Sequence, residues 1–138
     1  MRLRVLPLFA LAAVLAGCGS QGVVGPNPVT VIGTLPKPQA IPKGDPTRGK
    51  ALFIANGCGA CHTYKPAGST GTIGPNLDNL AADAQKANQG TLASYTATSI
   101  QNPGAYVVPG FPNGVMPTFS KLTPQQVGDL VAFLTQSH

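Results

Sequence analysis

The chain has 138 residues, of which 43% are hydrophobic and only 9% are charged, and its formal net charge is +5. This length predicts one small domain, and the 17 Gly and 14 Pro indicate that part of the chain is linker. The nine basic residues are too scattered for a nucleic-acid-binding stripe, and four acidic residues are too few for an acidic disordered tail. Because no hydrophobic run approaches the ~20 residues that a spanning helix needs, a multispanning membrane protein is excluded.

Residues 1–17 are typical of a secretory signal peptide. Arg2 and Arg4 form a positively charged start, and a hydrophobic stretch follows over residues 5–16. A short buried helix is the alternative, but Pro7 lies near the start of the stretch and disfavours it. We therefore expect the protein to be exported.

The residues that close this segment, Leu15-Ala16-Gly17-Cys18, resemble the lipobox of bacterial lipoproteins. The resemblance implies cleavage before Cys18 and attachment of lipid to its sulfur. Several acyl chains on one residue hold a protein firmly at a membrane, whereas a single chain binds only marginally. We expect a protein that is anchored to a bacterial membrane through Cys18 and faces the periplasm or the cell exterior.

Residues 18–44 are predicted to form a linker between the anchor and a folded domain. From residue 19 to residue 44 there are five Gly and five Pro. Proline removes backbone donors and fixes φ, so this segment cannot form a regular helix or sheet ladder. A brief strand at residues 29–32 is the alternative, although β-branched residues alone are a weak signal. The linker would lift a domain of residues 45–138 off the membrane.

The pattern of residues 45–138 predicts an all-α domain of three to four helices. Asp45 can cap a first helix that begins at Pro46, and Gly57 is a natural stop. The last helix begins with a capping box from Thr123 to Gln126. One face of that helix carries Val127, Leu130, Val131 and Leu134.

Two further helices are expected between these ends. Residues 91–101 form the longer one, which ends at Asn102-Pro103, and residues 77–87 form a shorter one. Two stripes compete for the buried face of the longer helix, namely Leu92, Tyr95 and Ser99 or Ala93, Ala97 and Ile100. Only four phenylalanines supply large aromatic surface in this domain, so we expect a bound group to fill its centre.

The segment Cys58-Gly59-Ala60-Cys61-His62 is a C-x-x-C-H motif, the signature of covalent attachment of a c-type haem. Two thiols three residues apart on one turn can form thioethers with the two vinyl groups of one haem. The adjacent histidine is then carried beneath the ring, where one imidazole nitrogen can bind iron. The motif therefore predicts one haem c held by Cys58, Cys61 and His62.

Two other kinds of site share parts of this motif. A structural zinc site needs four ligands, and the sequence has no second cysteine pair. A thiol–disulfide redox centre needs only Cys58 and Cys61, and export would permit a disulfide. Neither strand nor thioredoxin-like pattern precedes the motif, however, and a dithiol centre leaves His62 unused.

Met116 is the predicted second axial ligand of the iron. Beyond the signal segment it is the one methionine, and His138 is the one other histidine. Met116 lies in a loop with Gly114 before it and Pro117 after it, where proline fixes the backbone. Histidine with a thioether sulfur is a ligand pair of electron-transferring haem. An open site that binds a small ligand is the main alternative.

From Asp45 onward the chain resembles class I monohaem cytochromes c, including those of small bacterial lipoproteins and those attached to haem-copper oxidases. Besides the haem motif, the matching parts are Gly49, Phe53, Gly74-Pro75-Asn76-Leu77, Met116-Pro117-Thr118-Phe119 and the closing helix. The resemblance implies that the first and last helices cross at Gly49, with Phe53 near an aromatic such as Phe133. It also implies that the Pro75 carbonyl accepts a hydrogen bond from His62.

The resemblance further implies a one-electron carrier in a respiratory chain rather than an enzyme. Its partners would be an oxidase or dehydrogenase complex, of which it is either a shuttle or a fixed subunit. A haem-based sensor or gas-binding domain, and a thiol–disulfide oxidoreductase, stay as alternatives. The sequence lacks the tryptophan that often bonds a haem propionate, and Tyr95, Tyr106 and Asn79 are candidates to replace it.

Overall fold

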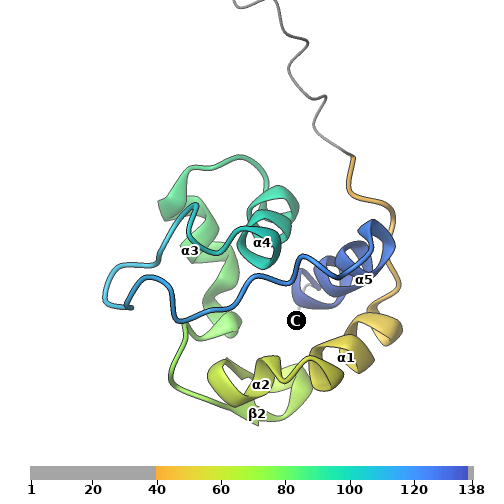
Figure 1. The fold of residues 1–138 in the computed structure, drawn as a ribbon, viewed down its shortest axis with the longest axis horizontal. Helices are drawn as coiled ribbons and strands as arrows, with labels where there is room; N and C mark the ends of the chain where they lie inside the picture. Colours follow the sequence, from red (N-terminus) through yellow and green to blue (C-terminus); the bar gives the residue numbers. More distant parts are fainter. Residues whose placement is uncertain (1–39, 137–138) are drawn as a thin grey trace, which may run out of the picture. The chain divides into compact units, whose positions relative to one another are not determined.

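The computed structural model describes residues 40–136. The predicted signal peptide, Cys18, most of the predicted linker with its alternative strand at residues 29–32, and His138 lie outside the described residues. Within the described part the chain forms five α-helices, two 3-10 helices and one pair of two-residue strands (Figure 1). No helix in residues 40–136 is both long and hydrophobic enough to cross a membrane. The all-α prediction is confirmed, with more helices than expected because single turns also form.

The elements follow one another closely along the chain. In order they are α1 (Pro46–Ala55), α2 (Cys58–Cys61), β1 (Thr63–Tyr64), η1 (Lys65–Ala67), β2 (Ser69–Thr70), η2 (Leu77–Asn79), α3 (Leu80–Ala87), α4 (Leu92–Gln101) and α5 (Pro124–Leu134). The strands β1 and β2 are antiparallel, with Thr63 opposite Thr70. A long loop without helix or strand connects α4 to α5 (Figure 1).

Side chains at the predicted caps begin the helices. Asp45 accepts hydrogen bonds from the backbone N–H groups of Thr47 and Arg48 at 2.7 and 3.2 Å, which starts α1. The capping box between Thr123 and Gln126 is present at the start of α5. These contacts satisfy N–H groups that have no partner inside the helix.

The helix α4 buries parts of both predicted stripes. Its buried residues are Tyr95, Thr96, Ala97 and Ile100. Leu92 and Ser99 are half-buried. The face that enters the core is thus centred between the two stripes, which explains why the sequence pattern favoured neither.

The helices α1 and α5 cross at Gly49 and form the main contact of the fold (Figure 1). A Cβ at Gly49 would lie 2.6 Å from the Cβ of Phe133 and would overlap the carbonyl of Asp129. The rings of Phe53 and Phe133 have centroids 5.8 Å apart. The expected crossing is confirmed, and glycine at this position is what permits the close approach.

Tyr64 adds a third ring to this contact and links it to the haem motif. Its ring centroid lies 5.9 Å from that of Phe53 and 5.2 Å from that of Phe133. Its hydroxyl donates to the carbonyl of Phe133 at 2.9 Å, and burial raises the pKa of Tyr64 to about 12. The hydroxyl therefore stays a donor at all physiological pH values and ties β1 to the end of α5.

A buried carboxylate lies on the inner face of α5. Asp129 is 3% exposed and accepts two hydrogen bonds from the guanidinium of Arg48, each of 2.9 Å. It also accepts from the backbone N–H of Asp45 at 2.8 Å and from Gln125 at 3.1 Å. The bonds from Arg48 hold the pKa of Asp129 well below its usual range. This group joins the start of α1 to α5.

The last residues of the predicted linker lie against α5. Gln125 donates to the carbonyl of Lys43 at 3.1 Å. A Cβ at Gly128 would lie 2.5 Å from the carbonyl oxygen of Pro42, and Ile41 packs against the core. Contacts with the domain therefore begin before Asp45.

Candidate cofactor site

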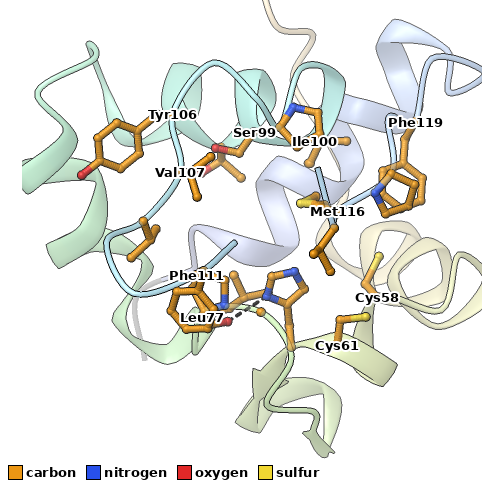
Figure 2. Close-up of a pocket in the computed structure, with 18 of the residues that line it drawn as sticks. Cys58, Cys61, Leu77, Ser99, Ile100, Tyr106, Val107, Phe111, Met116 and Phe119 are labelled. Atoms are coloured by element: carbon orange, nitrogen blue, oxygen red, sulfur yellow. Dashed lines mark hydrogen bonds between the residues drawn. The ribbon is translucent and has the colours of Figure 1, made fainter. Parts of the chain in front are cut away.

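The single-turn helix α2 presents both cysteines of the motif on one side. Gly57 has a φ of 69°, a left-handed conformation that lets the chain turn between α1 and α2. Residues three apart on a helical turn lie on the same face, so Cys58 and Cys61 project together into one pocket (Figure 2). Both thiols are free and half-buried.

Burial also governs the reactivity of the first thiol. Desolvation raises the pKa of Cys58 above its ordinary value. Cysteines that carry out thiol–disulfide exchange instead have a lowered pKa, because the thiolate is the nucleophile. The environment of Cys58 thus favours a structural or attachment role.

A backbone carbonyl fixes the ring of His62. Its Nδ1 lies 2.7 Å from the carbonyl oxygen of Pro75, and the residue is only 9% exposed. A carbonyl can only accept, so Nδ1 carries the proton. The lone pair of the other ring nitrogen, Nε2, is left for a metal. The structure thus contains the hydrogen bond that the resemblance implied.

Two glycines let the segment before Pro75 pack against the motif. A Cβ at Gly74 would lie 2.5 Å from Cε1 and 2.9 Å from Nδ1 of His62. A Cβ at Gly71 would lie 2.6 Å from the carbonyl oxygen of Ala60. The backbone N–H of Gly74 also donates to the carbonyl of Cys61 at 2.8 Å. We call residues 56–77 the His62 side of the pocket.

The pocket has a volume of about 620 Å³ and a mainly hydrophobic lining. Its second wall is the segment of residues 102–119, which we call the Met116 loop. Figure 2 shows Met116 on this loop pointing into the cavity that the cysteines face, together with Val107 and Phe111. Ile100, a side chain of α4, also lines the pocket.

The structure brings all five predicted site residues into one place. Cys58, Cys61, His62, Pro75 and Met116 line the same pocket. Of the three residues considered for a propionate, Tyr95 and Tyr106 line it, with ring centroids 6.0 Å apart, whereas Asn79 does not.

Sequence reasoning missed the close packing at Gly71 and the lining residues Val107, Val108 and Phe111. A signal for Gly71 was its place directly after a strand, where a glycine indicates close backbone approach. The loop residues carried no periodic signal, since they form neither helix nor strand.

These residues fit a covalently bound haem. The groups available to hold it are two free thiols, one imidazole with a free nitrogen and one thioether sulfur. They surround a hydrophobic cavity whose volume lies in the usual range of cofactor pockets. The cavity is far larger than the voids that a packed domain of this size tolerates without a bound group.

Comparison with known families agrees with this arrangement. A family model described as cytochrome c matches residues 46–138, which is more than half of the chain. The match begins at the first residue of α1 and includes the whole pocket. The chain therefore belongs to the cytochrome c family, as a class I monohaem member with covalently bound haem c and a role in electron transfer.

Proposed function

We propose that this protein is a membrane-tethered one-electron carrier of a respiratory chain, whose haem iron is ligated by His62 and Met116. The observation that carries the proposal is the pocket itself. One imidazole with its Nδ1 bonded to Pro75 and one thioether sulfur face the same cavity as two free thiols. Cys58 and Cys61 would provide the two thioether bonds to the haem.

When bound, the haem supplies a one-electron couple at its iron. The residues of the chain set how that couple behaves. His62 is held in one tautomer and one orientation by Pro75, and the tight contact at Gly74 prevents the ring from turning. A ligand that does not move keeps the structural change on electron transfer small.

Met116 and the pocket lining act on the relative stability of the two oxidation states. A thioether is a neutral ligand, and Ile100, Val107 and Phe111 surround the cavity with hydrocarbon. Both features disfavour the additional positive charge of the oxidised state, and hence they raise the reduction potential.

The tether is proposed from the sequence. Residues 1–17 have the pattern of a signal peptide, and Cys18 closes a lipobox-like sequence. An exported carrier on a lipid anchor would meet an oxidase or dehydrogenase complex at the membrane surface.

A haem-based gas sensor is the second candidate, and one observation favours it. The Met116 loop contains neither helix nor strand, and in the described part of the chain the backbone N–H groups of Val115 and Met116 make no hydrogen bond. A ligand on such a loop is more easily displaced than one on a packed helix. The third alternative, a thiol–disulfide oxidoreductase, is disfavoured by the raised pKa of Cys58.

The substitution Met116→Leu tests the ligand assignment and separates the two haem functions. Leucine keeps the volume of the side chain but has no sulfur. We expect a haem that stays attached, binds carbon monoxide when reduced and has a lower potential, whereas the wild-type protein resists carbon monoxide. The measurements are a pyridine haemochrome assay, carbon monoxide titration and potentiometry. An unchanged spectrum and potential would remove Met116 from the site, and carbon monoxide binding by the wild type would favour the sensor.

The substitution Cys18→Ser tests the tether. We expect a haem-bearing protein that no longer sediments with membranes, because the lipid has lost its attachment sulfur. The matched control is Cys58→Ser, which should stay on the membrane and lose one thioether bond. Membrane attachment that persists in the Cys18 variant contradicts the anchor.

A further inference from the structure

The sequence contains two Asn-Gly pairs, and each lies just before a residue of the cofactor site. Asn56-Gly57 precedes Cys58, and Asn113-Gly114 lies shortly before Met116. In such a pair the backbone nitrogen of the glycine can attack the side-chain carbonyl of the asparagine. The absence of a Cβ on glycine leaves this approach unhindered. Whether a given pair reacts depends on whether both groups are free to move.

The pair before Cys58 is held by hydrogen bonds on both reacting groups. The side-chain amide of Asn56 donates to the carbonyl of Leu52 at 2.8 Å. The backbone N–H of Gly57 donates to the carbonyl of Ile54 at 3.0 Å. Asn56 is also half-buried as the C-terminal cap of α1. Both bonds must break before the glycine nitrogen can reach the side chain.

The pair before Met116 is open. Asn113, Gly114 and Val115 are all exposed. Within residues 40–136, neither the side chain of Asn113 nor the backbone N–H of Gly114 makes a hydrogen bond. A Cβ built at Gly114, which has a φ of 78°, would meet no atom within 4 Å, so the turn has room for a ring to form.

We propose that Asn113 is a site of spontaneous deamidation on the Met116 loop. The nitrogen of Gly114 forms a bond to Cγ of Asn113, the bond from Cγ to Nδ2 breaks, and the N–H proton of Gly114 leaves with the amine as ammonia. Water then opens the five-membered imide at either carbonyl. The products are aspartate at position 113 or isoaspartate, in which the backbone runs through the side-chain carbon.

Deamidation of Asn113 would alter the reduction potential of the haem, a consequence that rests on the proposed ligation by Met116. An aspartate has an ordinary pKa of ~3.9 and is ionised at neutral pH, so a negative charge appears three residues from Met116. Negative charge near the iron favours the oxidised state and lowers the potential. Isoaspartate also adds one methylene to the backbone, which displaces the loop that carries Met116.

The test is to age the haem-loaded protein in mildly alkaline buffer and to map the sites by peptide mass spectrometry. Each hydrogen bond that must open reduces the reactive fraction about fivefold. The two bonds at Asn56 therefore predict that Asn113 converts roughly 25-fold faster than Asn56. Asn113→Gln is the matched control, since its longer side chain must close a larger and slower ring. Equal conversion at the two sites, or none at Asn113, overturns the proposal.

A second arm separates this proposal from the proposed function. Asn113→Asp introduces the charge without the longer backbone and should lower the potential less than the aged wild-type protein does. Failure of Asn113 to convert overturns the deamidation and leaves the ligation by Met116 untouched. Conversion at Asn113 in a protein whose Met116→Leu variant keeps its spectrum supports the deamidation and overturns the ligand assignment.

Discussion

The His62 side of the pocket is held by hydrogen bonds and close packing, whereas the Met116 loop is held by little besides its own turns. On the His62 side, Pro75 fixes the imidazole, Gly74 donates to the backbone of Cys61, and Thr63 donates to the carbonyl of Gly71 at 2.8 Å. At the start of the Met116 loop, Asn102 caps α4 and donates its backbone N–H to Thr98 at 2.6 Å. After this cap, the backbone N–H groups of the loop make few and longer hydrogen bonds, from Ala105, Phe111 and Phe119 at 3.0, 3.2 and 3.4 Å.

The two sides of the pocket contribute differently to holding a cofactor. Covalent attachment needs two thiols and an imidazole in a fixed arrangement, and the His62 side provides it through contacts between residues close in sequence. A single ligand on an exposed loop lies in one of the least stable parts of a protein, where local opening costs little free energy. We therefore expect substitutions on the His62 side to lower the stability of the fold. Substitutions on the Met116 loop should instead change the ligation and the reduction potential of the iron.

The largest expected effect comes from Gly74→Ala. The new Cβ would lie 2.5 Å from Cε1 of His62, so the ring or the backbone must move and the hydrogen bond to Pro75 is lost. Overpacking of this kind costs about 3 kcal/mol in the free energy of unfolding. Denaturant unfolding of the haem-loaded protein measures it, together with the yield of attached haem.

Gly114→Ala is the matched change on the Met116 loop. A Cβ there meets no atom, and the only penalty is the left-handed backbone, with a φ of 78°, which costs an alanine about 1 kcal/mol. Equal destabilisation by the two substitutions would contradict the difference between the two sides.

The next largest effect is expected from Tyr64→Phe. The substitution keeps the three-ring cluster and removes only the hydroxyl that donates to the carbonyl of Phe133. A buried carbonyl that loses its donor costs about 1–2 kcal/mol. Thermal or denaturant unfolding measures the loss. Tyr106 is half-buried on the Met116 loop, and Tyr106→Phe should change the free energy of unfolding by less than about 0.5 kcal/mol. A larger loss there than at Tyr64 would reverse the comparison.

The sequence predicted the elements whose signals are local. Asp45 with Pro46, and Thr123 with Gln126, carry their own capping chemistry, and both helices begin where expected. The haem motif lies on one turn, so its spacing alone placed Cys58 and Cys61 together. Such features depend on neighbours within one or two turns.

The features that the sequence did not predict depend on residues far apart along the chain. Arg48 lies near the positive end of a helix dipole, which is mildly unfavourable for a cation, yet its two shortest hydrogen bonds go to Asp129, 81 residues later. The third ring of the aromatic cluster, Tyr64, meets Phe133 across 69 residues. A carboxylate between the hydrophobic positions of the last helix was the one hint of a buried ion pair, because a charge is rarely buried without a partner.

The smallest of these effects is expected from Asp129→Asn, and it depends on pH. Asparagine can still accept from Asp45 and Gln125, and Arg48 is exposed enough to return to water, so the loss at neutral pH should be less than for Gly74→Ala or Tyr64→Phe. Arg48 lowers the pKa of Asp129 in the folded protein below its ordinary value of 3.8. The carboxylate therefore stabilises the fold above about pH 4, and this contribution is lost as the pH falls toward the folded pKa. Denaturant unfolding of both proteins between neutral and acidic pH should show the wild type more stable at neutral pH and the gap closing below pH ~4. A difference in stability that stays constant as the pH falls would mean that the charge of Asp129 does not hold α1 against α5. The two helices would then be held together by packing alone.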